Sequence, residues 1–343
     1  MKYLIVSLVF IFSVSSFSKS VSIMNYNVEN LFDTLHDENR EDYTYLPYAV
    51  KKNSAKIRKY CLSLSKKSWR KECLYTDWNK DVVNNKLKNI AKVVNSYDGG
   101  ADIIVLQEVE NENVLRMLVE ELGANKYKYY SLLEGPDVRG IDNGVISKYP
   151  ITFSKLHRID LGSSSNRPTR DILETRVNVD GKEISLFANH WPSQGGPSIL
   201  REHAARALVK VAKNSTSDLT IALGDFNTLK KDRPHGINNH VLKYFYDAHT
   251  EALNQGVRLR DGSHWYRGEW SRLDRIFVLK NSRISKDFRG FKIHSMPFMF
   301  KDLEWTDYST GEVTVYRDVP FRFDDESMQG FSDHLPLVFS LNL

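Results

Sequence analysis

The chain has 343 residues, of which 41% are hydrophobic, and it carries a formal net charge of +5. This length is ample for one large globular core or two modest ones, and the mild positive charge suits a polyanionic substrate without establishing one. The two cysteines have no nearby histidine, which disfavours a zinc site, and no segment beyond the N-terminus is long and apolar enough to span a bilayer.

The N-terminus has the pattern of a secretory signal peptide. Residues 1–3 include a lysine and precede an apolar run over residues 4–12, and a plausible cleavage site follows at residues 16–18. The run is too short for a membrane-spanning helix. A buried first strand is the alternative, but a strand beginning at Val21 already fills that position. We therefore expect residues 1–18 to be removed and the mature protein to be exported, periplasmic or secreted, without a stable membrane anchor.

A strand and a long segment of weak periodicity come next. Residues 21–26 alternate in the manner of a strand that ends at Asn27. Residues 33–80 are rich in Tyr, Lys and Asp and hold both cysteines, and we expect them to form an insertion on the rim of the fold. Because export favours oxidation, Cys61 and Cys73 are expected to form a disulfide rather than remain as two buried thiols.

A basic run lies within this insertion. Residues 51–71 hold nine lysines or arginines and no acid, and aromatic residues such as Trp69 and Tyr75 are interleaved nearby. A cationic groove with stacking aromatics is what nucleic acid binding needs. A solvated helical face with its aromatic rings packed on the core is an equally good interpretation. The candidate substrate-binding residues are Lys51, Lys52, Lys56, Arg58 and Lys59.

Beyond the insertion, amphipathic helices alternate with buried strands. Apolar spacing predicts helices around residues 83–94, 114–119 and 200–211. Apolar or alternating runs predict strands at residues 102–106, 184–188, 219–223, 272–278 and 335–341.

Polar clusters stand at the ends of the predicted strands. They are residues 25–30, 107–108, 189–190, 224–227 and 331–336, with Asp274 inside a further strand. Carboxylates, amides and histidines brought together at strand ends are what metal-assisted phosphoryl chemistry requires. A site assembled from Asn27 to His334 cannot be split, which favours a single domain.

In their order and spacing these clusters resemble the endonuclease/exonuclease/phosphatase superfamily, which has the deoxyribonuclease I-like fold. The resemblance runs from about Val21 to Leu343. It implies an α+β fold in which two mixed β-sheets pack as a sandwich with helices on both outer faces. It also implies one domain over residues 19–343, with the insertion at about 33–80. The resemblance does not fix the substrate, because members cleave DNA, RNA, phospholipids and inositol phosphates.

The resemblance implies a metal site. Glu108 and Asp333 would hold Mg²⁺ or Mn²⁺, with Ca²⁺ as a further candidate. Asn27 would support both the metal and the phosphate. Without the other motifs, Glu108 would be interpreted as an acid at a helix N-terminus and Asn27 as a turn residue.

The catalytic roles follow from the same resemblance. Asp225 would orient or deprotonate the attacking water, and Asn227 would hydrogen-bond a phosphoryl oxygen, although Gly-Asp after a strand is also a common turn. The glycine at position 224 allows a close backbone approach. His334 would protonate the leaving oxygen or stabilise the charge of the pentacovalent species. Asp274 would orient the imidazole of His334 through its other nitrogen.

Two further residues are catalytic candidates. His190 matches a histidine of the deoxyribonuclease and sphingomyelinase branches that abasic-site repair enzymes lack, although alone it would be a satisfied core histidine. Arg139 is expected to face the site as a phosphate clamp, with a solvated loop charge as the alternative. Repair-type relatives place a tyrosine near that point, so the chain departs from them, and His190 favours the deoxyribonuclease and sphingomyelinase branches. The expected branch is the secreted bacterial-type nucleases.

The expected function is that of an exported, divalent-metal-dependent endonuclease that hydrolyses phosphodiester bonds of DNA or RNA as a monomer. A phospholipid phosphodiesterase of the sphingomyelinase type, or a phosphatase, is the alternative. Exposure of the apolar residues 296–300 would support the lipid alternative, but a buried strand is the preferred interpretation of that segment. A binding protein with an inactive site is disfavoured because no expected catalytic position is substituted.

Overall fold

The structure is a computed structural model that describes residues 20–283, 286–306 and 310–343. The predicted signal peptide over residues 1–18 lies outside the described residues. Within them, no helix is both long and apolar enough to cross a membrane.

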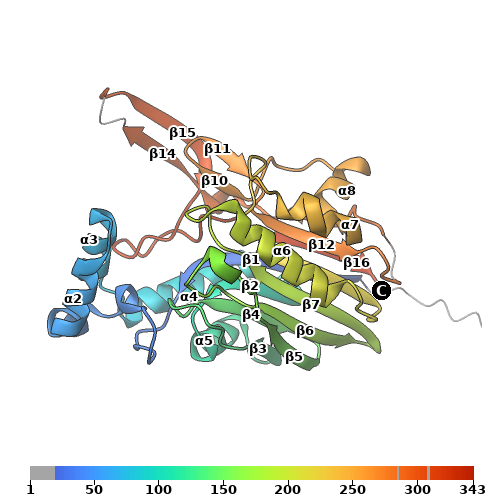
Figure 1. Cartoon of the computed structure of the whole chain (residues 1–343), viewed down its shortest axis with the longest axis horizontal. Helices are drawn as coiled ribbons and strands as arrows, with labels where there is room; N and C mark the ends of the chain where they lie inside the picture. Colours follow the sequence, from blue (N-terminus) through green and yellow to red (C-terminus); the bar gives the residue numbers. More distant parts are fainter. Residues whose placement is uncertain (1–19, 284–285, 307–309) are drawn as a thin grey trace, which may run out of the picture.

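Two mixed six-stranded sheets form the framework (Figure 1). The first contains, in spatial order, β13 (Phe291–Ile293), β16 (Leu337–Asn342), β1 (Ser20–Leu31), β2 (Ile103–Val109), β4 (Asp142–Ser147) and β3 (Tyr129–Leu132). The second contains β5 (Ile151–His157), β6 (Ile172–Val179), β7 (Lys182–His190), β8 (Leu219–Asp225), β12 (Asp274–Leu279) and β9 (Phe245–Asp247). Each sheet has a central parallel pair, β1 with β2 and β7 with β8, so these four strands end at the same edge of their sheets.

Helices cover both outer faces of the sandwich and confirm the predicted α+β fold. They are α4 (Lys80–Asn95) and α5 (Glu112–Leu122) on the first sheet, α6 (Ser198–Ala212) and α7 (Leu242–Tyr244) on the second, and α8 (Ala248–Asn254), which packs on β12 and β13. Asparagine side chains cap α4 and α5: Asn79 accepts from the backbone N–H of Val82, and Asn111 from that of Val114. Short single turns occur at Tyr43–Tyr45, Gly162–Ser164, Ile237–Val241 and Pro297–Met299.

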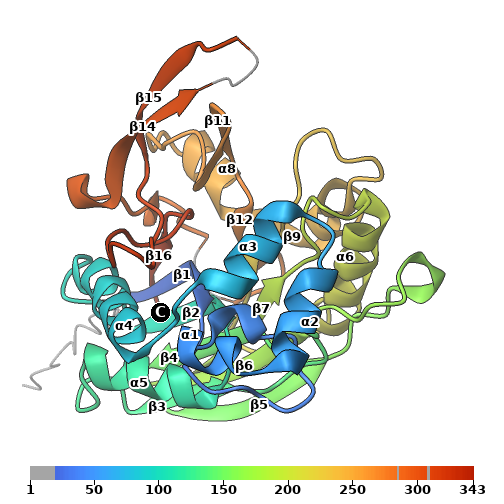
Figure 2. The ribbon, with the colours of Figure 1, turned by 90° about the vertical axis from the view of Figure 1, so that its left-hand side faces the viewer.

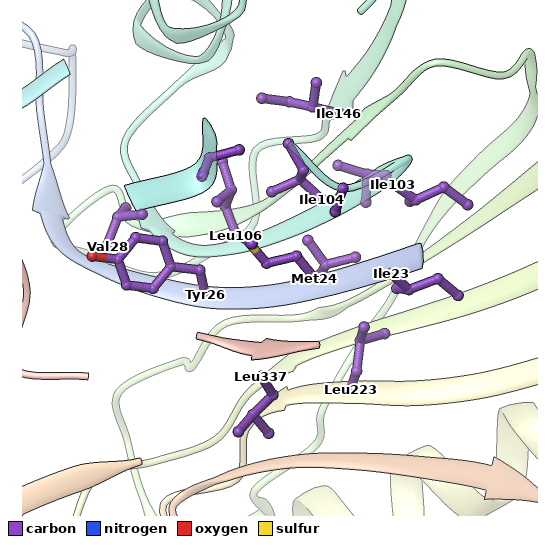
Figure 3. Packing of buried hydrophobic residues seen from close by; sticks show 14 of the residues in the cluster. Ile23, Met24, Tyr26, Val28, Ile103, Ile104, Leu106, Ile146, Leu223 and Leu337 are labelled. Carbon is purple, nitrogen blue, oxygen red and sulfur yellow. The ribbon is translucent and has the colours of Figure 1, made fainter. Parts of the chain in front are cut away.

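The two sheets pack face to face around one large apolar core (Figure 3). Ile23 of β1, Leu223 of β8 and Leu337 of β16 lie in it. Side chains on a strand alternate between its two faces, so Phe187 of β7 and Ala222 of β8 join a second buried cluster beneath α6 instead. Because both faces of the second sheet are covered, its strands are held rigidly and can position side chains at their ends.

The insertion over residues 33–80 is a small helical unit at the end of the sandwich where β1 finishes (Figure 2). Its helices are α1 (Tyr48–Lys52), α2 (Ala55–Ser63) and α3 (Lys67–Tyr75). Phe32, directly after β1, stacks on Tyr45 with ring centroids 4.0 Å apart and accepts a hydrogen bond from the indole of Trp78. Aromatic packing therefore attaches the insertion to the first sheet.

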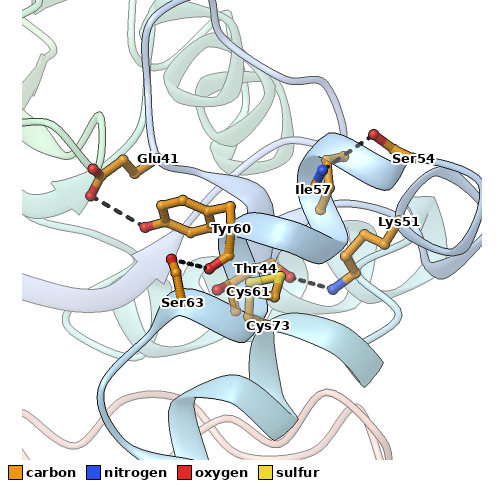
Figure 4. Close-up of a disulfide and its surroundings, with 9 residues drawn as sticks. All are labelled: Glu41, Thr44, Lys51, Ser54, Ile57, Tyr60, Cys61, Ser63 and Cys73. Atoms are coloured by element: carbon orange, nitrogen blue, oxygen red, sulfur yellow. Dashed lines mark hydrogen bonds between the residues drawn. A yellow bond between two sulfur atoms is a disulfide. The ribbon is translucent and has the colours of Figure 1, made fainter.

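The predicted disulfide between Cys61 and Cys73 is present and joins α2 to α3, with Cα atoms 5.4 Å apart (Figure 4). It belongs to a small apolar cluster with Tyr43, Leu46 and Ile57. Helices this short are not stable alone, and a closed loop of this size stabilises the folded state by about 3 kcal/mol in the chain-entropy model. The cross-link and the cluster together explain how a segment with weak periodicity forms helices.

Two hairpins lie outside the main sheets, and neither was predicted. They are β10 (His264–Tyr266) with β11 (Glu269–Ser271), and β14 (Phe300–Thr306) with β15 (Val313–Pro320). Figures 1 and 2 show the β14–β15 hairpin projecting away from the sandwich.

The interpretation of residues 296–300 as a buried strand is wrong. Pro297–Met299 form a 3₁₀ turn, and β14 begins only at Phe300. Proline fixes its φ near the helical value and has no backbone N–H to donate to a neighbouring strand. Phe298 is half-buried against Phe331, with ring centroids 5.2 Å apart, so the segment is not an exposed membrane-inserting element either.

Asp142, at the start of β4, is a buried carboxyl that links stability to pH. Its Oδ1 accepts a hydrogen bond from Gly135 N–H, whereas Oδ2 has no partner among the described residues. Burial raises the pKa of Asp142 from 3.8 to about 7. Because the folded-state pKa is raised, the stabilising contribution is complete below about pH 4 and is lost as the pH rises through about 7.

We expect Asp142→Asn to keep the acceptor for Gly135 and to remove the cost of ionising a buried acid. The variant should match the wild type near pH 4 and exceed its free energy of unfolding by on the order of 4 kcal/mol near pH 8. Urea unfolding at the two pH values measures this difference. Parallel stability curves for the two proteins across that range would show that Asp142 does not titrate as stated.

Candidate active site

Strands from both sheets bring polar side chains to one end of the sandwich. Asp225, the last residue of β8, pairs with Asp274, the first residue of the antiparallel β12. On its other side, Gly224 pairs with Asn189 of β7. A Cβ atom on Gly224 would lie 1.9 Å from the carbonyl oxygen of Asn189, and its φ is +143°. The predicted close backbone approach is confirmed, and only glycine fits there.

β-Bulges change the direction of the side chains at the ends of β1 and β2. The pairing of β1 with β2 shifts register between Asn27 and Leu31, and that of β2 with β4 between Gln107 and Val109. Glu108 sits in the second bulge with φ +63°. Bulges beside active sites typically redirect a side chain, and a left-handed glutamate is held only by surrounding contacts. One such contact is the hydrogen bond from the backbone N–H of Asn30 to Glu108 Oε2, 3.0 Å.

Asn27 joins two carboxylates. Its amide nitrogen lies 3.4 Å from Glu108 Oε1 and 3.3 Å from Asp225 Oδ2. Its own Oδ1 accepts a hydrogen bond from the backbone N–H of Glu29 at 3.0 Å. Asn27 therefore positions the carboxylates of Glu108 and Asp225, and its side-chain oxygen is already occupied by the hydrogen bond from Glu29.

Asp225 is buried and held by Asn227. The backbone N–H of Asn227 donates to Asp225 Oδ1 at 2.8 Å, and its side-chain amide donates to Oδ2 at 3.0 Å. Burial, with the nearby Asp274 and Glu108 carboxylates, raises the pKa of Asp225 to about 7, although the His334 imidazolium opposes the shift. A carboxylate with a pKa near neutrality is well matched to accept a proton at physiological pH.

His334 and Asp274 form a close pair. His334 Nδ1 lies 2.7 Å from Asp274 Oδ2, and Ser263 Oγ also donates to that oxygen. Burial opposes protonation of the ring, but the carboxylates of Asp274, Asp333 and Asp225 outweigh it and raise the pKa of His334 well above its ordinary value. The imidazolium is therefore the stable form near neutral pH, with Nδ1 engaged by Asp274 and no hydrogen bond to Nε2 from the described residues.

His190 is close to the same acids but differs electrostatically. Its Nε2 lies 3.7 Å from both Glu108 Oε1 and Asp225 Oδ2. Burial, reinforced by the charges of Arg170 and Arg139, lowers its pKa well below the ordinary value. The two histidines therefore differ in protonation near neutral pH: His334 is charged and His190 is neutral.

Asp333 lies on the opposite side of His334 from Asp274. Its backbone N–H donates to Glu29 Oε2 at 3.0 Å, and its carboxylate lies 3.8 Å from the guanidinium of Arg322 and from His334 Nε2. Burial would raise the pKa of Asp333, but His334 and Arg322 hold it below its usual value. The acid is therefore ionised and available to a cation.

A cavity of about 520 Å³ joins these groups. Seven of the nine predicted catalytic and metal residues line it, namely Glu108, Arg139, His190, Asp225, Asn227, Asp333 and His334. Asn27 and Asp274 lie directly behind, in contact with Asp225 and His334. The structure therefore brings all nine together.

Sequence reasoning missed several polar residues of the cavity, among them Arg170 and His264. Arg170 donates to the carbonyl oxygen of Trp191 and lies 3.3 Å from Asp137. His264, in the unpredicted β10, stacks near His334 with ring centroids 4.7 Å apart. Neither residue follows a predicted strand, so no signal of the kind used for the other clusters marks them. Arg139 donates to Asn30 Oδ1 at 2.7 Å, which places two arginines on the cavity wall.

The predicted substrate-binding cations are separate from this cavity, and one of them is mispredicted. Lys51 is 1% exposed and donates to the carbonyl oxygen of Thr44 (Figure 4). Because its ammonium is buried on the inner face of α1, it cannot contact a substrate in this conformation. The other four are exposed on α1 and α2: Lys52, Lys56, Arg58 and Lys59.

The donor set fits a hard divalent cation. Glu108 and Asp225 bring two carboxylates to within hydrogen-bonding distance of the one amide of Asn27, and the charge of Glu108 contributes to the raised pKa of Asp225. A cation bound at Glu108 would relieve this repulsion, and carboxylate oxygens suit Mg²⁺ or Mn²⁺. A second group, His264, Asp333 and His334, offers ligand atoms within 4.8 Å of one another.

Comparisons with known proteins agree with the fold. Residues 72–343 match a family model described as the endonuclease/exonuclease/phosphatase family. No curated protein sequence matches the chain significantly.

Similar solved structures cover almost the whole chain. One is TDP2 from D. rerio, complexed with single strand DNA product, with 14% identity, a TM-score of 0.51, and coverage of 94% of this chain and 99% of that chain. Another is a variant of beta toxin from Staphylococcus aureus with bound magnesium ions, with 16% identity, a TM-score of 0.53, and coverage of 95% and 100%. A third is an endonuclease/exonuclease/phosphatase family protein from Bacteroides thetaiotaomicron, with 16% identity, a TM-score of 0.51, and coverage of 94% and 97%. At these identities the likeness concerns the fold.

Proposed function

The chain belongs to the endonuclease/exonuclease/phosphatase family, and from this premise we propose that it is an exported, divalent-metal-dependent nuclease that hydrolyses phosphodiester bonds of DNA or RNA. The observation that carries the proposal is the His334–Asp274 pair, which shares one cavity with the Asp225 carboxylate. A charged acid and a carboxylate base facing one cavity are the two groups that phosphodiester hydrolysis needs.

Asp225 accepts the proton of the attacking water. Its two hydrogen bonds from Asn227 fix the carboxylate, and its pKa of about 7 leaves it largely ionised above neutrality. After proton transfer, the neutral acid is tolerated because the site is buried. The side-chain amide of Asn227 donates to Asp225 Oδ2 and to the carbonyl oxygen of Trp191, so in this conformation it positions Asp225 and has no further N–H for a phosphoryl oxygen.

His334 protonates the leaving oxygen. Its Nδ1–H is directed to Asp274, which leaves the proton on Nε2 for the departing group. His190 stays neutral and donates a hydrogen bond to the phosphoryl group, while Arg139 and Arg170 supply positive charge as the pentacovalent species forms.

Glu108, supported by Asn27, would hold the divalent cation, and Asp333 is a further candidate ligand. Such a cation supplies Lewis acidity to the phosphoryl oxygens. We expect excess EDTA to abolish hydrolysis and Mg²⁺ or Mn²⁺ to restore it. Activity assays before and after dialysis against chelator measure this dependence, and full activity in EDTA would remove the metal from the proposal.

Three observations favour nucleic acid and export. Exposed cations are concentrated on α1–α3, at the end of the sandwich that carries the site (Figure 2), and a basic surface attracts a phosphate chain. A similar structure, TDP2 from D. rerio, is complexed with single strand DNA product. Disulfides such as Cys61–Cys73 persist mainly in oxidising compartments. We further propose that the protein acts as a monomer.

A phospholipid phosphodiesterase is the second candidate, and one observation favours it. The projecting β14–β15 hairpin exposes Trp305, Val313 and Val315. Exposed apolar side chains on a projecting element can enter a membrane interface. This hairpin, rather than residues 296–300, is therefore the segment to test for lipid contact.

The substrate can be determined by incubating the mature protein with supercoiled plasmid, single-stranded RNA and sphingomyelin vesicles in Mg²⁺ or in EDTA. We expect metal-dependent nicking or degradation of nucleic acid and no release of phosphocholine. Release of phosphocholine without cleavage of DNA or RNA would replace the nuclease by the lipid enzyme.

The basic surface of the insertion gives a separate prediction. Replacing Lys52, Lys56, Arg58 and Lys59 with glutamine should weaken nucleic acid binding. The log–log salt slope should fall by about 0.7–0.9 for each phosphate that the variant no longer neutralises. Binding titrations of a fluorescent oligonucleotide at several salt concentrations measure the slope.

A matched control neutralises four exposed lysines outside the insertion, Lys128, Lys155, Lys182 and Lys210. We expect this control to keep the wild-type slope. Equal slopes for the wild type and the insertion variant would mean that these four side chains do not contact phosphates and that the insertion has only a structural role.

A further inference from the structure

A second cavity continues from the catalytic one. It has a volume of about 660 Å³ and shares His264, Tyr266 and Asp333 with the catalytic cavity. Its remaining walls come from the β10–β11 turn and from the β14–β15 hairpin, which stand at the same side of the molecule (Figure 1). A substrate chain that leaves the catalytic centre past Asp333 therefore enters this cavity.

Aromatic rings dominate its walls. Tyr266 is 60% exposed and Trp305 is 46% exposed, although large rings are ordinarily buried. Trp265 and Tyr316 pack edge to face, with ring centroids 5.0 Å apart, and this contact links the two hairpins. The exposed rings are thus mounted on a supported scaffold, and the Arg267 guanidinium lies 5.2 Å from the centroid of the Tyr266 ring, over one face of it.

Positive charge accompanies the rings. Arg267, Lys301 and Arg322 line the cavity. Arg322 is paired with Glu29 and Asp333 at the catalytic end, which leaves Arg267 and Lys301 as the cations farther out.

The basic and acidic residues of β14 lie on opposite faces of the strand. Lys301, Leu303 and Trp305 line the cavity, whereas the intervening Asp302 and Glu304 do not. Successive side chains of a strand point to opposite faces, so the acids of this strand lie away from the cavity. The cavity face therefore combines apolar rings with cations, which is complementary to a base attached to a phosphate.

We propose that this cavity binds the nucleotide next to the scissile phosphate, with its base stacked on Tyr266 and Trp305 and its phosphate near Arg267 and Lys301. The proposal rests on the nuclease function proposed above and specifies a single-stranded substrate, because a base paired within a duplex does not present its face to a protein ring. Rings that stack bases beside a cationic backbone track are the general means of holding single strands.

The alternative occupant is a lipid surface, and the cavity walls disfavour it. Burial of this face in the acyl layer of a membrane would remove Arg267 and Lys301 from water together with Trp305. Removing such charges from water without partners is costly. A single strand of nucleic acid satisfies both the rings and the cations.

The test uses the metal-loaded full-length mature protein and three variants: Tyr266→Ala, Trp305→Ala and the control Val315→Ala. Val315 lies on the same hairpin, is 52% exposed and does not line the cavity. Values of kcat and KM are measured for a single-stranded oligonucleotide and for bis(p-nitrophenyl) phosphate, which is too small to reach the outer cavity. The informative quantity is the ratio of the two kcat/KM values.

Loss of one stacking ring costs about 1–3 kcal/mol per base. We therefore expect Tyr266→Ala and Trp305→Ala each to lower this ratio by about 5-fold or more, mainly through a higher KM for the oligonucleotide. Val315→Ala should keep the wild-type ratio.

Three different results would contradict the stacking site, the nuclease function or both, and each can be told from the others. If the wild type cleaves the oligonucleotide and both ring variants keep its ratio, the stacking site is wrong and the nuclease function stands. If the wild type hydrolyses only the small diester, the nuclease function fails, and the stacking site fails with it. If Trp305→Ala and Val315→Ala both fail to bind sphingomyelin vesicles that the wild type binds, the hairpin contacts lipid and the stacking site is overturned.

Discussion

Replacing His334 with glutamine should lower kcat for phosphodiester hydrolysis by about 10²–10⁴-fold while the protein remains folded. Glutamine keeps a hydrogen-bonding group near Asp274 but has no proton to transfer at neutral pH. The wild-type imidazolium is stabilised against burial by three carboxylates, and glutamine cannot reproduce that charge. Steady-state kinetics with circular dichroism of both proteins measure the effect.

A matched control replaces another buried histidine outside the cavity. His294 is 7% exposed, and its Nε2 is hydrogen-bonded to Ser96 Oγ. His294→Gln should retain a rate near that of the wild type. A His334→Gln enzyme with the same rate as this control would remove His334 from the mechanism.

Asp274 acts through His334, and its role has a distinct signature. Removal of its carboxylate in Asp274→Asn should lower the pKa of His334. Since the protonated ring is the active form, the alkaline limb of the kcat profile should then move to lower pH. A lower rate with an unchanged pH profile would indicate a structural role only.

Replacing Asp225 with asparagine should also lower kcat by about 10²–10⁴-fold, because an amide cannot accept the proton of water. The variant should remain folded. Burial raises the pKa of Asp225 to about 7, so the wild-type residue stabilises the fold at low pH and loses that contribution as the pH rises through 7. Asparagine has no such loss and still accepts the backbone N–H of Asn227, but its Nδ2 cannot accept the amides of Asn27 and Asn227 that now donate to Asp225 Oδ2. Thermal unfolding and kinetics of the same preparation separate the two effects.

An Asp225→Asn enzyme that retains its rate would exclude the residue as the base. An enzyme that loses both activity and its folded structure would instead identify Asp225 as a structural residue.

The control for Asp225→Asn should be another buried residue that does not take part in the reaction. Asn189→Asp is not a suitable control, because Asn189 accepts from the indole of Trp191 within the buried site region. Asp232→Asn is better, since that acid holds Arg201 at 2.7 Å and lies outside the catalytic pair.

The strand ends could be predicted because a simple pattern marks them. Buried apolar runs end in Glu108 and Asp225, and β2 and β8 end within a residue of those positions. Helix α4, over Lys80–Asn95, likewise includes the segment predicted from its apolar spacing. Local periodicity and parallel pairing were sufficient to bring these residues to one edge of the fold.

The remaining features depend on contacts that are distant in sequence. The left-handed conformation of Glu108 follows from a bulge imposed by its neighbours in the sheet, and nothing in the residues around it signals a bulge. The insertion helices have few apolar residues and depend on the Cys61–Cys73 cross-link. Lys51 was counted as exposed because composition alone does not show which face of a short helix is buried.

The central claim is that this cavity hydrolyses nucleic acid with His334 as its acid. The most direct measurement incubates an end-labelled single-stranded oligonucleotide, as DNA and as RNA, with the wild type and with His334→Gln, in Mg²⁺ and in Mg²⁺ with excess EDTA. Gel analysis should show fragments of at least one of the two oligonucleotides with the wild type in Mg²⁺, and a loss of about 10²-fold or more with the variant or the chelator. Intact DNA and RNA in every lane, or equal cleavage by the two proteins, would contradict the claim.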